Sequence, residues 1–474
     1  MKVYNTQVNK WAFAPISANA AFLAVEILLL YPVPMLLKRL PVFAPAVSVL
    51  DIAAGALLIA AAVLLLLAGL IEAMTPPAEK VKRMVCRGLF DPARGNPLSL
   101  RGGELLPRVR CKCVGEGRYD LNISAQQGVT VETIRKAAPA ISAALSRHFQ
   151  RYAVVAAAQD TAYNCVTFRL EDVKVDHCIT YHNVEVMRPE RPTLLTVQNN
   201  VSIDLTTSGS MLVAGKTRSG KTTGVISLLL QVLLSGQDKF GSLVNIIDPK
   251  RAELSRLPHT ITIDDDGEVR AIVETLRTFA ETVTQRQEIL NGLSDKKGDA
   301  VKWYDAGMKP SFLFIDEYVA LRSILPKKAA KDDEGYSLDA FDGLLKRIVT
   351  MGASAGCFVI ISVAEASVQE GGLPAMLRSA MSTRVLFRPT MAEARLIWDK
   401  EKLETMPNSM VCGPGDAWFS STDGVHEAVN YVRFPRLKFP AYRELGRLLK
   451  QYYEADAGGG GSEADATPST LPRI

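Results

Sequence analysis

The chain has 474 residues, which is enough for two or three domains because single hydrophobic cores rarely grow beyond about 250 to 300 residues. Its formal net charge of +5 is a small basic excess for this length, so charge alone does not indicate a nucleic-acid partner. Seven cysteines are scattered without a Cys-x-x-Cys pair or a histidine cluster at zinc spacing. This distribution favours reduced thiols over a disulfide framework or a zinc site.

Two apolar segments near the start of the chain predict membrane spans. Residues 52–71 carry no charged side chain, and about 20 such residues cross a bilayer core of about 30 Å. The earlier run, 18–37, includes Glu26 and a Tyr-Pro-Val-Pro segment, so we expect its helix to be kinked or to end early. A signal peptide is disfavoured because no small-residue cleavage site follows. Together the two spans predict a transmembrane hairpin over residues 18–74, after a cytoplasmic segment 1–17.

The middle of the chain predicts a linker, 75–103, and then a small α+β domain, 104–190. Alternation typical of strands flanks a region of helical period, and the segments are 108–114, 119–123, 131–149 (helical), 152–157 and 166–170. The histidines and arginines of this region form no catalytic constellation. We therefore expect a role in packing or assembly.

The strongest signal is a phosphate-binding loop of the form Gly-x-x-x-x-Gly-Lys-Thr, which is entered from an apolar strand and followed by a helical run. Its glycines allow backbone N–H groups to close around phosphates at a helix N-terminus. Lys221 would reach the β and γ phosphates, and the Thr222 hydroxyl would bind magnesium. The pattern predicts ATP and magnesium as cofactors, with these binding residues: Gly215, Lys216, Thr217, Arg218, Ser219, Gly220, Lys221, Thr222 and Thr223.

A second apolar strand, 311–315, ends in Asp316 and Glu317. This is a Walker B pattern, in which the aspartate holds hydrated magnesium and the glutamate polarises the attacking water. Phosphoryl transfer requires positioned charge more than covalent chemistry, so Lys221, Thr222 and this acidic pair are a sufficient set for hydrolysis. The adjacent Glu317 predicts an ATP hydrolase rather than a nucleotide sensor.

Strands alternate with helices through residues 191–440, with further strands predicted at 243–248, 357–362 and 383–388. This alternation predicts an α/β domain, a RecA-like P-loop ATPase whose parallel sheet has helices on both faces. Ligands of such sheets bind at the carboxyl ends of the strands. Residues 441–474 predict a short helix and a disordered, glycine-rich tail.

The nucleotide motif also decides the predicted orientation in the membrane. Basic residues outside the two spans suit a cytoplasmic placement of both ends, whereas Lys38 and Arg39 in the connecting loop argue the other way. ATP is available in the cytosol. We therefore expect a multi-pass protein of the cell membrane with its ATPase domain in the cytoplasm.

Over residues 194–435 the chain resembles the FtsK/SpoIIIE branch of P-loop motors. The likeness includes the phosphate loop, the Phe-Ile-Asp-Glu strand end, Ser-Thr-Arg-Val-Leu-Phe and Gly-Pro-Gly-Asp-Ala-Trp. Its most specific part is an Ile-Asp-Pro-Lys-x-x-Glu-Leu element that contains Asp248, Lys250 and Glu253. The small α+β domain also looks like the one that precedes the motor core in this family.

The resemblance implies a homo-oligomeric, hexameric ring with ATP held between neighbours and DNA in the central channel. An arginine of one subunit would reach the γ phosphate bound by the next, with Arg384 as the first candidate and Arg347 as the second. The competing interpretation for either arginine is an ordinary pair with a carboxylate of the same subunit.

The chain departs from the family pattern in three places. Residues 363–366 read Val-Ala-Glu-Ala where these motors carry a Thr-Gln-Arg-Pro sensor, so the residue that couples hydrolysis to DNA movement is not identified. Ser354 stands where an arginine is common, and no winged-helix module is found after Pro435.

Two spans, a short linker and no DNA-reading module resemble the TcpA-like coupling proteins of Gram-positive conjugative elements. This resemblance implies a relaxase, its relaxosome and transfer-channel proteins as partners. A chromosome-partitioning translocase is the first alternative, disfavoured by the absent winged helix. A type VII-like protein-secretion ATPase is the second, although such motors usually carry several ATPase domains. A non-hydrolysing scaffold is disfavoured by Glu317.

Overall fold

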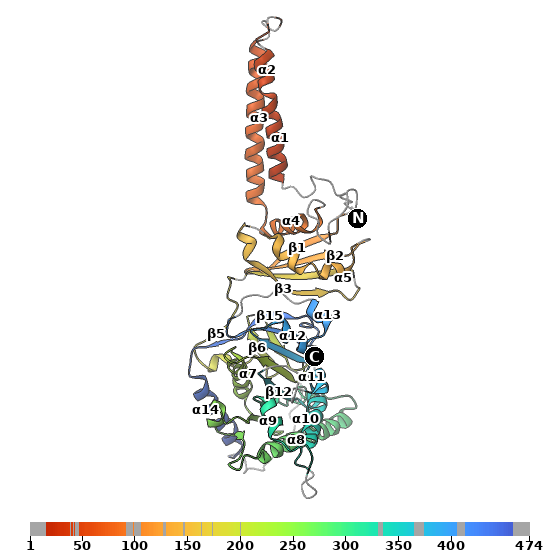
Figure 1. Cartoon of the computed structure of the whole chain (residues 1–474), viewed down its shortest axis with the longest axis vertical. Helices are drawn as coiled ribbons and strands as arrows, with labels where there is room; N and C mark the ends of the chain where they lie inside the picture. The colour runs from red at the N-terminus through yellow and green to blue at the C-terminus, as the bar shows by residue number, and fades with distance from the viewer. Residues whose placement is uncertain are drawn as a thin grey trace. The chain divides into compact units, whose positions relative to one another are not determined.

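The computed structural model describes residues 16–37, 39–40, 42, 47–91, 98, 106–126, 129–145, 147–162, 164–172, 174–199, 201–329, 335–364, 374–404 and 413–457. These residues fall into two compact units, one from the start of the chain to Val175 and one from Asp176 to the end. Glu404 alone among the later described residues groups with the first unit. Figure 1 labels the helices and strands of both units.

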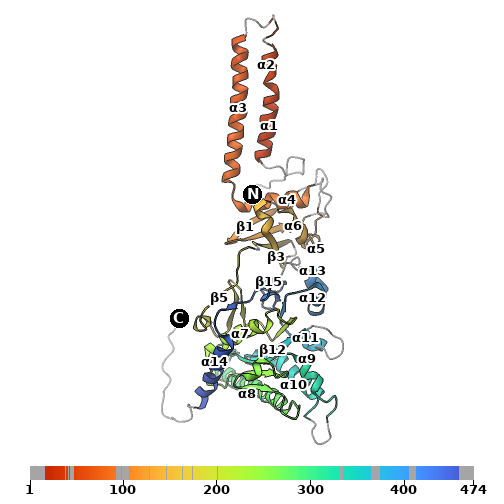
Figure 2. The same ribbon diagram turned by 60° about the vertical axis from the view of Figure 1, so that its left-hand side comes forward.

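The first unit begins with apolar helices that pack on one another. Helices α1 (Ile16–Leu30) and α2 (Pro32–Leu37) lie alongside α3 (Val47–Met74), as Figures 1 and 2 show. The break at Tyr31 confirms the expected interruption, because Pro32 and Pro34 cannot continue the backbone hydrogen bonds of α1. Among the described helices, only the segment Asp51–Met74 is long and apolar enough to cross a membrane. A span over α1 and α2 stays a prediction.

Helix α4 (Pro77–Phe90) lies within the predicted linker, 75–103, and is packed rather than extended. Val81, Val85 and Leu89 share one face of α4 and are buried with the core of the small domain that follows. Their spacing of four residues was the sequence signal for this helix. The compact part of the first unit therefore begins earlier along the chain than the sequence indicated.

The small domain is an antiparallel sheet with short helices, as an α+β prediction requires. Its strand order is β1 (Val109–Gly115), β2 (Arg118–Ser124), β4 (Cys165–Asp172) and β3 (Tyr152–Gln159). The helical region expected at 131–149 is broken into α5 (Val131–Arg135), α6 (Ala138–Ala144) and the 3-10 helix η3 (Arg147–Arg151). Pro139 explains the first break, because proline lacks an N–H and is accepted only in the first turn of a new helix.

The second unit contains a sheet of eight strands, most of them parallel. Its order is β10 (Thr260–Thr262), β9 (Val244–Asp248), β11 (Ser311–Ile315), β12 (Cys357–Val363), β8 (Met211–Gly215), β13 (Thr383–Phe387), β14 (Asp416–Ser420) and β15 (Asn430–Arg433). Neighbours from β10 to β13 pair in parallel, and β14 and β15 add an antiparallel edge. The inner strands are continuous apolar runs because both faces of the sheet are covered.

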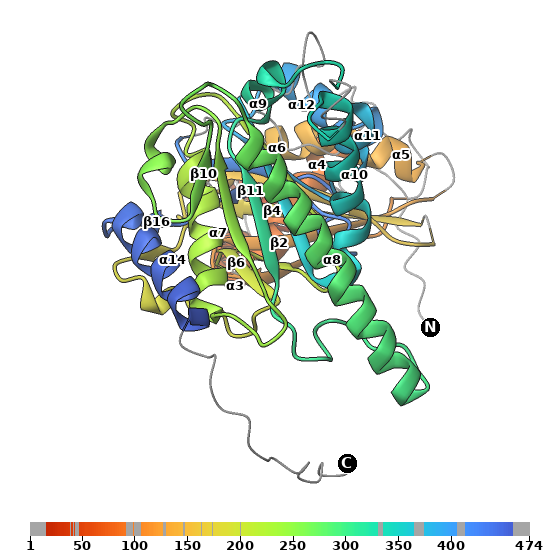
Figure 3. The same ribbon diagram turned by 90° about the horizontal axis from the view of Figure 1, so that it is seen from below.

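Helices cover both faces, which confirms the predicted α/β class. Helix α7 (Lys221–Ser235) packs with α14 (Ala441–Ala457), and strand residues such as Val213 and Phe314 are buried in their cluster. The alternate strand residues face the other way. Helix α8 (Arg270–Lys297) lies beside α10 (Leu338–Met351) on that second side, as Figure 3 shows.

Shorter elements complete the second unit: β5 (Thr180–Tyr181), η4 (Glu185–Met187), β6 (Leu194–Gln198), β7 (Val201–Asp204), η5 (Glu253–Arg256), α9 (Tyr318–Ile324), η6 (Gly352–Ala355), α11 (Ala375–Ala380), α12 (Met391–Ile397), α13 (Lys400–Glu404) and β16 (Arg436–Leu437). Strand β5 pairs in parallel with β16, far along the chain. Helix α14 is longer than the short helix expected after residue 440, and the Tyr453 hydroxyl on it donates to the Val244 carbonyl of β9. The predicted tail beyond Ala457 lies outside the described residues.

Candidate nucleotide site

Parallel strands bring the predicted site residues to one edge of the sheet. Strand β8 ends at Gly215 and leads into the phosphate loop, β9 ends at Asp248, and β11 is followed by Asp316 and Glu317. Strand β11 is paired with both β9 and β12, and β12 with β8. The carboxyl ends of these strands therefore place three motifs, far apart in sequence, around one site.

The phosphate loop adopts a conformation that requires glycine at Gly220. Its φ of +94° lies in the left-handed region, and a Cβ there would lie 2.5 Å from the Gly415 backbone nitrogen. That same nitrogen donates a hydrogen bond of 2.8 Å to the Ser219 carbonyl. The segment 413–415 thus packs directly on the loop, a contact that the sequence motifs did not reveal.

The loop has the features of a phosphate cradle. Helix α7 begins at Lys221, immediately after the loop, so its first backbone N–H groups point towards the site. The Ser219 side chain is buried, and its Oγ has no hydrogen-bond partner among the described residues. Lys216, Thr217 and Arg218 are exposed. Buried polar groups and free N–H groups at a helix start fit an anionic polyphosphate such as ATP.

Lys221 and the Walker B carboxylates form a charged group inside the protein. The Lys221 side chain is only 11% exposed, and its Nζ lies 4.0 Å from Glu317 Oε2. Burial lowers the pKa of Lys221, while the charges of Glu317 and Asp316 oppose that shift. Burial raises the pKa of Asp316, and the Lys221 ammonium opposes it. Each charge therefore offsets part of the cost of burying the other.

Glu317 is held by groups that follow two strands, β9 and β12. Its Oε2 lies 3.1 Å from Lys250 Nζ, and its Oε1 accepts a hydrogen bond of 3.2 Å from the Ala364 backbone nitrogen. Its φ of +53° is uncommon for a residue with a side chain, and such backbone strain concentrates at functional sites. Ala364 is the second residue of the segment 363–366, which replaces the family sensor, and Glu365 and Ala366 lie outside the described residues.

The Ile-Asp-Pro-Lys element is organised by a buried carboxylate. Asp248 accepts hydrogen bonds of 3.1 Å from the backbone nitrogens of Lys250 and Ser255, one on each oxygen. This pairing fixes the turn that carries Lys250 to Glu317. Glu253, further along the element, accepts a hydrogen bond of 2.8 Å from the Tyr442 hydroxyl of α14.

The two arginines considered for a role in a neighbouring subunit's site are engaged within this chain. Arg384 donates to the carbonyls of Met381, Arg378 and Ile397, the last at 2.7 Å, and burial lowers its pKa. Arg347 donates to Thr284 Oγ1 on α8. A role for either arginine in trans stays a prediction.

The predicted magnesium ligands, Thr222 and Asp316, follow β8 and β11, two strands separated in the sheet by β12. Among the described residues, no group of three or more histidine, cysteine or acidic side chains could hold a metal ion. A hydroxyl and a carboxylate fit magnesium, because this ion usually binds one or two protein ligands together with waters and substrate phosphates.

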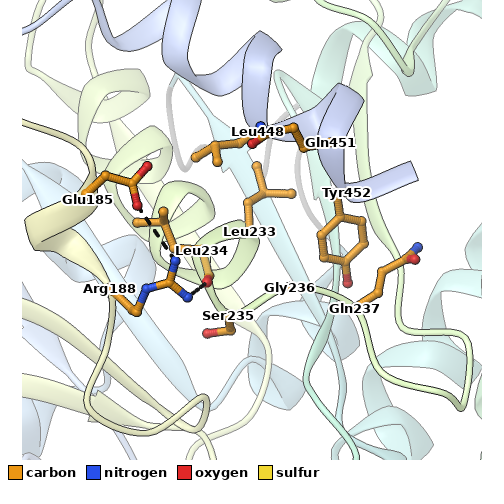
Figure 4. A pocket seen from close by; sticks show the side chains of 10 residues that line it. All are labelled: Glu185, Arg188, Leu233, Leu234, Ser235, Gly236, Gln237, Leu448, Gln451 and Tyr452. Atoms are coloured by element: carbon orange, nitrogen blue, oxygen red, sulfur yellow. Dashed lines mark hydrogen bonds and ion pairs between the residues drawn. The ribbon is translucent and has the colours of Figure 1, made fainter. Parts of the chain in front are cut away.

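A cavity of about 290 Å³ lies at the opposite end of α7 and is shown in Figure 4. It is lined by Leu233, Leu234, Ser235, Gly236, Gln237, Glu185, Arg188, Leu448, Gln451 and Tyr452. Arg188 donates to the Leu234 carbonyl, and Lys309 Nζ donates to the Ser235 carbonyl. These cations satisfy carbonyls at the C-terminal end of α7. The cavity therefore surrounds this helix end and is separate from the nucleotide site, which lies at the start of α7.

The comparisons with known proteins agree with the family named from the motifs. Residues 184–365 match the FtsK/SpoIIIE family model. The Ftsk domain-containing protein YdcQ of Bacillus subtilis (strain 168) is 27% identical over 168 residues, covering 35% of this chain and 32% of that protein. The DNA translocase FtsK of Campylobacter jejuni (strain 81-176) is 26% identical over 233 residues, covering 47% and 22%. This chain therefore spans a third or less of the length of these relatives.

Among solved structures, the pCW3 conjugation coupling protein TcpA aligns with 78% of this chain and 99% of its own, at 14% identity and a TM-score of 0.45. ATPases 2 and 3 of EssC from Geobacillus thermodenitrificans align with 59% of this chain and 52% of theirs, at 16% identity and a TM-score of 0.40. The family model match confirms the prediction made from the phosphate loop and the Ile-Asp-Pro-Lys element. Over residues 184–365, this chain is therefore similar to the FtsK/SpoIIIE family.

Proposed function

We propose that this chain is a membrane-anchored, ATP-driven DNA translocase that serves as the coupling protein of a conjugative transfer system. The observation that carries the ATPase part is the convergence of Lys221, Asp316 and Glu317 at one edge of the sheet of a FtsK/SpoIIIE-family domain. Relatives named DNA translocase FtsK support DNA as the substrate. The apolar helix Asp51–Met74 supports the membrane anchor.

The site residues suit hydrolysis of the γ phosphate of ATP. Lys221 would bind the β and γ phosphates, and the N–H groups at the start of α7 would bind phosphate oxygens. Glu317, with one oxygen fixed by a backbone N–H, would orient the attacking water and accept its proton. Magnesium, held by Thr222 and Asp316, would supply the charge that neutralises the phosphates. A neighbouring subunit's arginine, Arg384 or Arg347, would complete the site in a hexameric ring.

The conjugative role is the finer part of the proposal. Delivery of relaxase-bound DNA to a transfer channel would need a motor domain on the cytoplasmic side of the membrane. Relatives named DNA translocase favour this role over type VII-like protein secretion. Chromosome partitioning by the same kind of motor is the second candidate within the family.

The test is ATP hydrolysis by the full chain in detergent, with and without duplex or single-stranded DNA. We expect DNA to stimulate hydrolysis and the stimulation to fall as salt rises, because phosphate contacts dominate non-specific DNA binding. Lys221→Ala should abolish nucleotide binding or hydrolysis, and Glu317→Gln should bind ATP without turning it over. Hydrolysis that no DNA affects would contradict DNA translocation and favour protein secretion. Capture of a relaxase from the same genetic element would test the conjugative role.

A further inference from the structure

Two lysines face one carboxylate oxygen in the nucleotide site. Lys250 Nζ lies 3.1 Å from Glu317 Oε2, and Lys221 Nζ lies 4.0 Å from the same atom. The other oxygen, Oε1, is occupied by the backbone N–H of Ala364. Both contacts are ion pairs, and the contact of Lys250 is the shorter of the two. Lys250 is therefore the nearer counter-ion of Oε2, and Lys221 interacts with this oxygen more weakly.

The three side chains differ in their exposure to water. Those of Lys221 and Glu317 are each 11% exposed, whereas that of Lys250 is 50% exposed. Charges in the interior interact more strongly than charges in water. If Lys250 were absent, the buried carboxylate would keep one nearby ammonium, that of Lys221. The two side chains are close enough that a small rotation would join them.

The backbone around Lys250 is built to hold this lysine in place. Pro249 precedes it, and the buried Asp248 carboxylate accepts hydrogen bonds from the backbone nitrogens of Lys250 and Ser255. The turn is therefore fixed on both sides of Lys250. A lysine needed only for solubility would not require a turn that is fixed by a buried carboxylate.

We infer that Lys250 is a positioning residue, which holds the Glu317 carboxylate and thereby leaves the Lys221 ammonium available to the phosphates of the nucleotide. This inference deepens the proposed ATPase function and rests on it. Lys250 would touch neither the phosphates nor the attacking water. It acts by preventing an ion pair between the two residues that must work on opposite sides of the γ phosphate.

The experiment is a double-mutant cycle read by binding of ATPγS to the full chain in detergent. Lys250→Met keeps the length of the side chain and removes its charge. We expect it to weaken ATPγS binding about 10-fold, as a coupling between contacting groups of about 1.4 kcal/mol would do. In a Glu317→Gln background, where no carboxylate can capture Lys221, the same substitution should change binding less than about twofold. Lys250→Arg should restore binding, and Lys346→Met, on the exposed face of α10, is the control.

Steady-state kinetics give a second measurement. Lys250→Met should raise the KM for ATP more than it lowers kcat, and Lys250→Gln should behave alike if the charge is what matters. Equal loss of binding in both backgrounds would overturn the inference, because Lys250 would then contact the nucleotide itself. Unchanged binding in Lys250→Met would also overturn it.

The cycle separates this inference from the proposed function. A wild-type chain that binds no ATPγS would refute both. A wild-type chain that binds ATPγS but shows no hydrolysis stimulated by DNA would refute DNA translocation, and the cycle would still decide the role of Lys250.

Discussion

Replacing Gly220 by alanine tests the packing of the phosphate loop against segment 413–415. The structure supplies a matched control in Gly241, whose φ of +72° is also left-handed but whose added Cβ would meet nothing within 4 Å. At Gly220 the added Cβ would lie 2.5 Å from the Gly415 nitrogen and 3.0 Å from its Cα. Both substitutions strain the backbone, and only one creates a clash.

The expected losses of stability follow from the backbone strain and the steric clash. A side chain in the left-handed region costs roughly 1–2 kcal/mol, so Gly241→Ala should lower the free energy of unfolding by about that amount. A clash with backbone in a packed region adds about 1–3 kcal/mol, which gives about 2–5 kcal/mol for Gly220→Ala. The segment 413–415 must also move, which would break the hydrogen bond from the Gly415 nitrogen to the Ser219 carbonyl.

Urea unfolding of the full chain in detergent measures the difference. Tryptophan fluorescence reports mainly on the second unit, because three of the four tryptophans, Trp303, Trp398 and Trp418, are buried there. Only Gly220→Ala should also lose ATPγS binding. Equal destabilisation of the two variants, within about 0.5 kcal/mol, would show that segment 413–415 does not press on the loop and would refute the reasoning.

Two further predictions concern stability away from the nucleotide site. In the wild-type chain the buried Arg286 guanidinium lies 3.2 Å from Asp238. Asp238→Asn should lower the free energy of unfolding by about 3–5 kcal/mol, because it leaves this guanidinium without its counter-ion. Urea unfolding checks this, with Arg277→Ala in an exposed pair expected to cost about 0–1 kcal/mol. Burial acts to raise the pKa of Asp423, but hydrogen bonds from His426 and from nearby backbone N–H groups together outweigh it and lower the pKa. Its contribution to stability is therefore present above the pKa of the unfolded chain and lost as pH falls through the folded value. The difference between wild type and Asp423→Asn should vanish in acid, and a constant difference from pH 7 to about pH 3 would contradict this.

The features that the sequence predicted are those determined by residues close to one another along the chain. The glycines and the Lys-Thr pair of the phosphate loop dictate a backbone that only a few residue types accept, and apolar strands ending in acidic residues identify the edge of a covered parallel sheet. Short sequence patterns are therefore sufficient to predict the loop, Asp316 and Glu317 as nucleotide-site residues. The family followed from the same short elements.

The parts that were missed depend on contacts between distant segments. The packing of segment 413–415 beneath Gly220 joins residues almost 200 positions apart, and no local pattern reports it. The pair between Lys250 and Glu317 likewise depends on the neighbouring positions of β9 and β11. Helix α4 was absent from the prediction because its polar residues made the region resemble a linker, although its buried face has a regular period.

The strand pair β5 and β16 has a mechanical consequence. Asp176, where the chain enters the second unit, forms ion pairs with Arg433, at 3.2 Å, and with Arg436, at 2.6 Å. Tension transmitted through the preceding chain would thus be borne by Arg436 on β16 and by Arg433 on β15, at the antiparallel border of the sheet. The strands that lead into the phosphate loop and the Walker B pair lie further inside the sheet, so a pull on the preceding chain would be resisted before it could distort them.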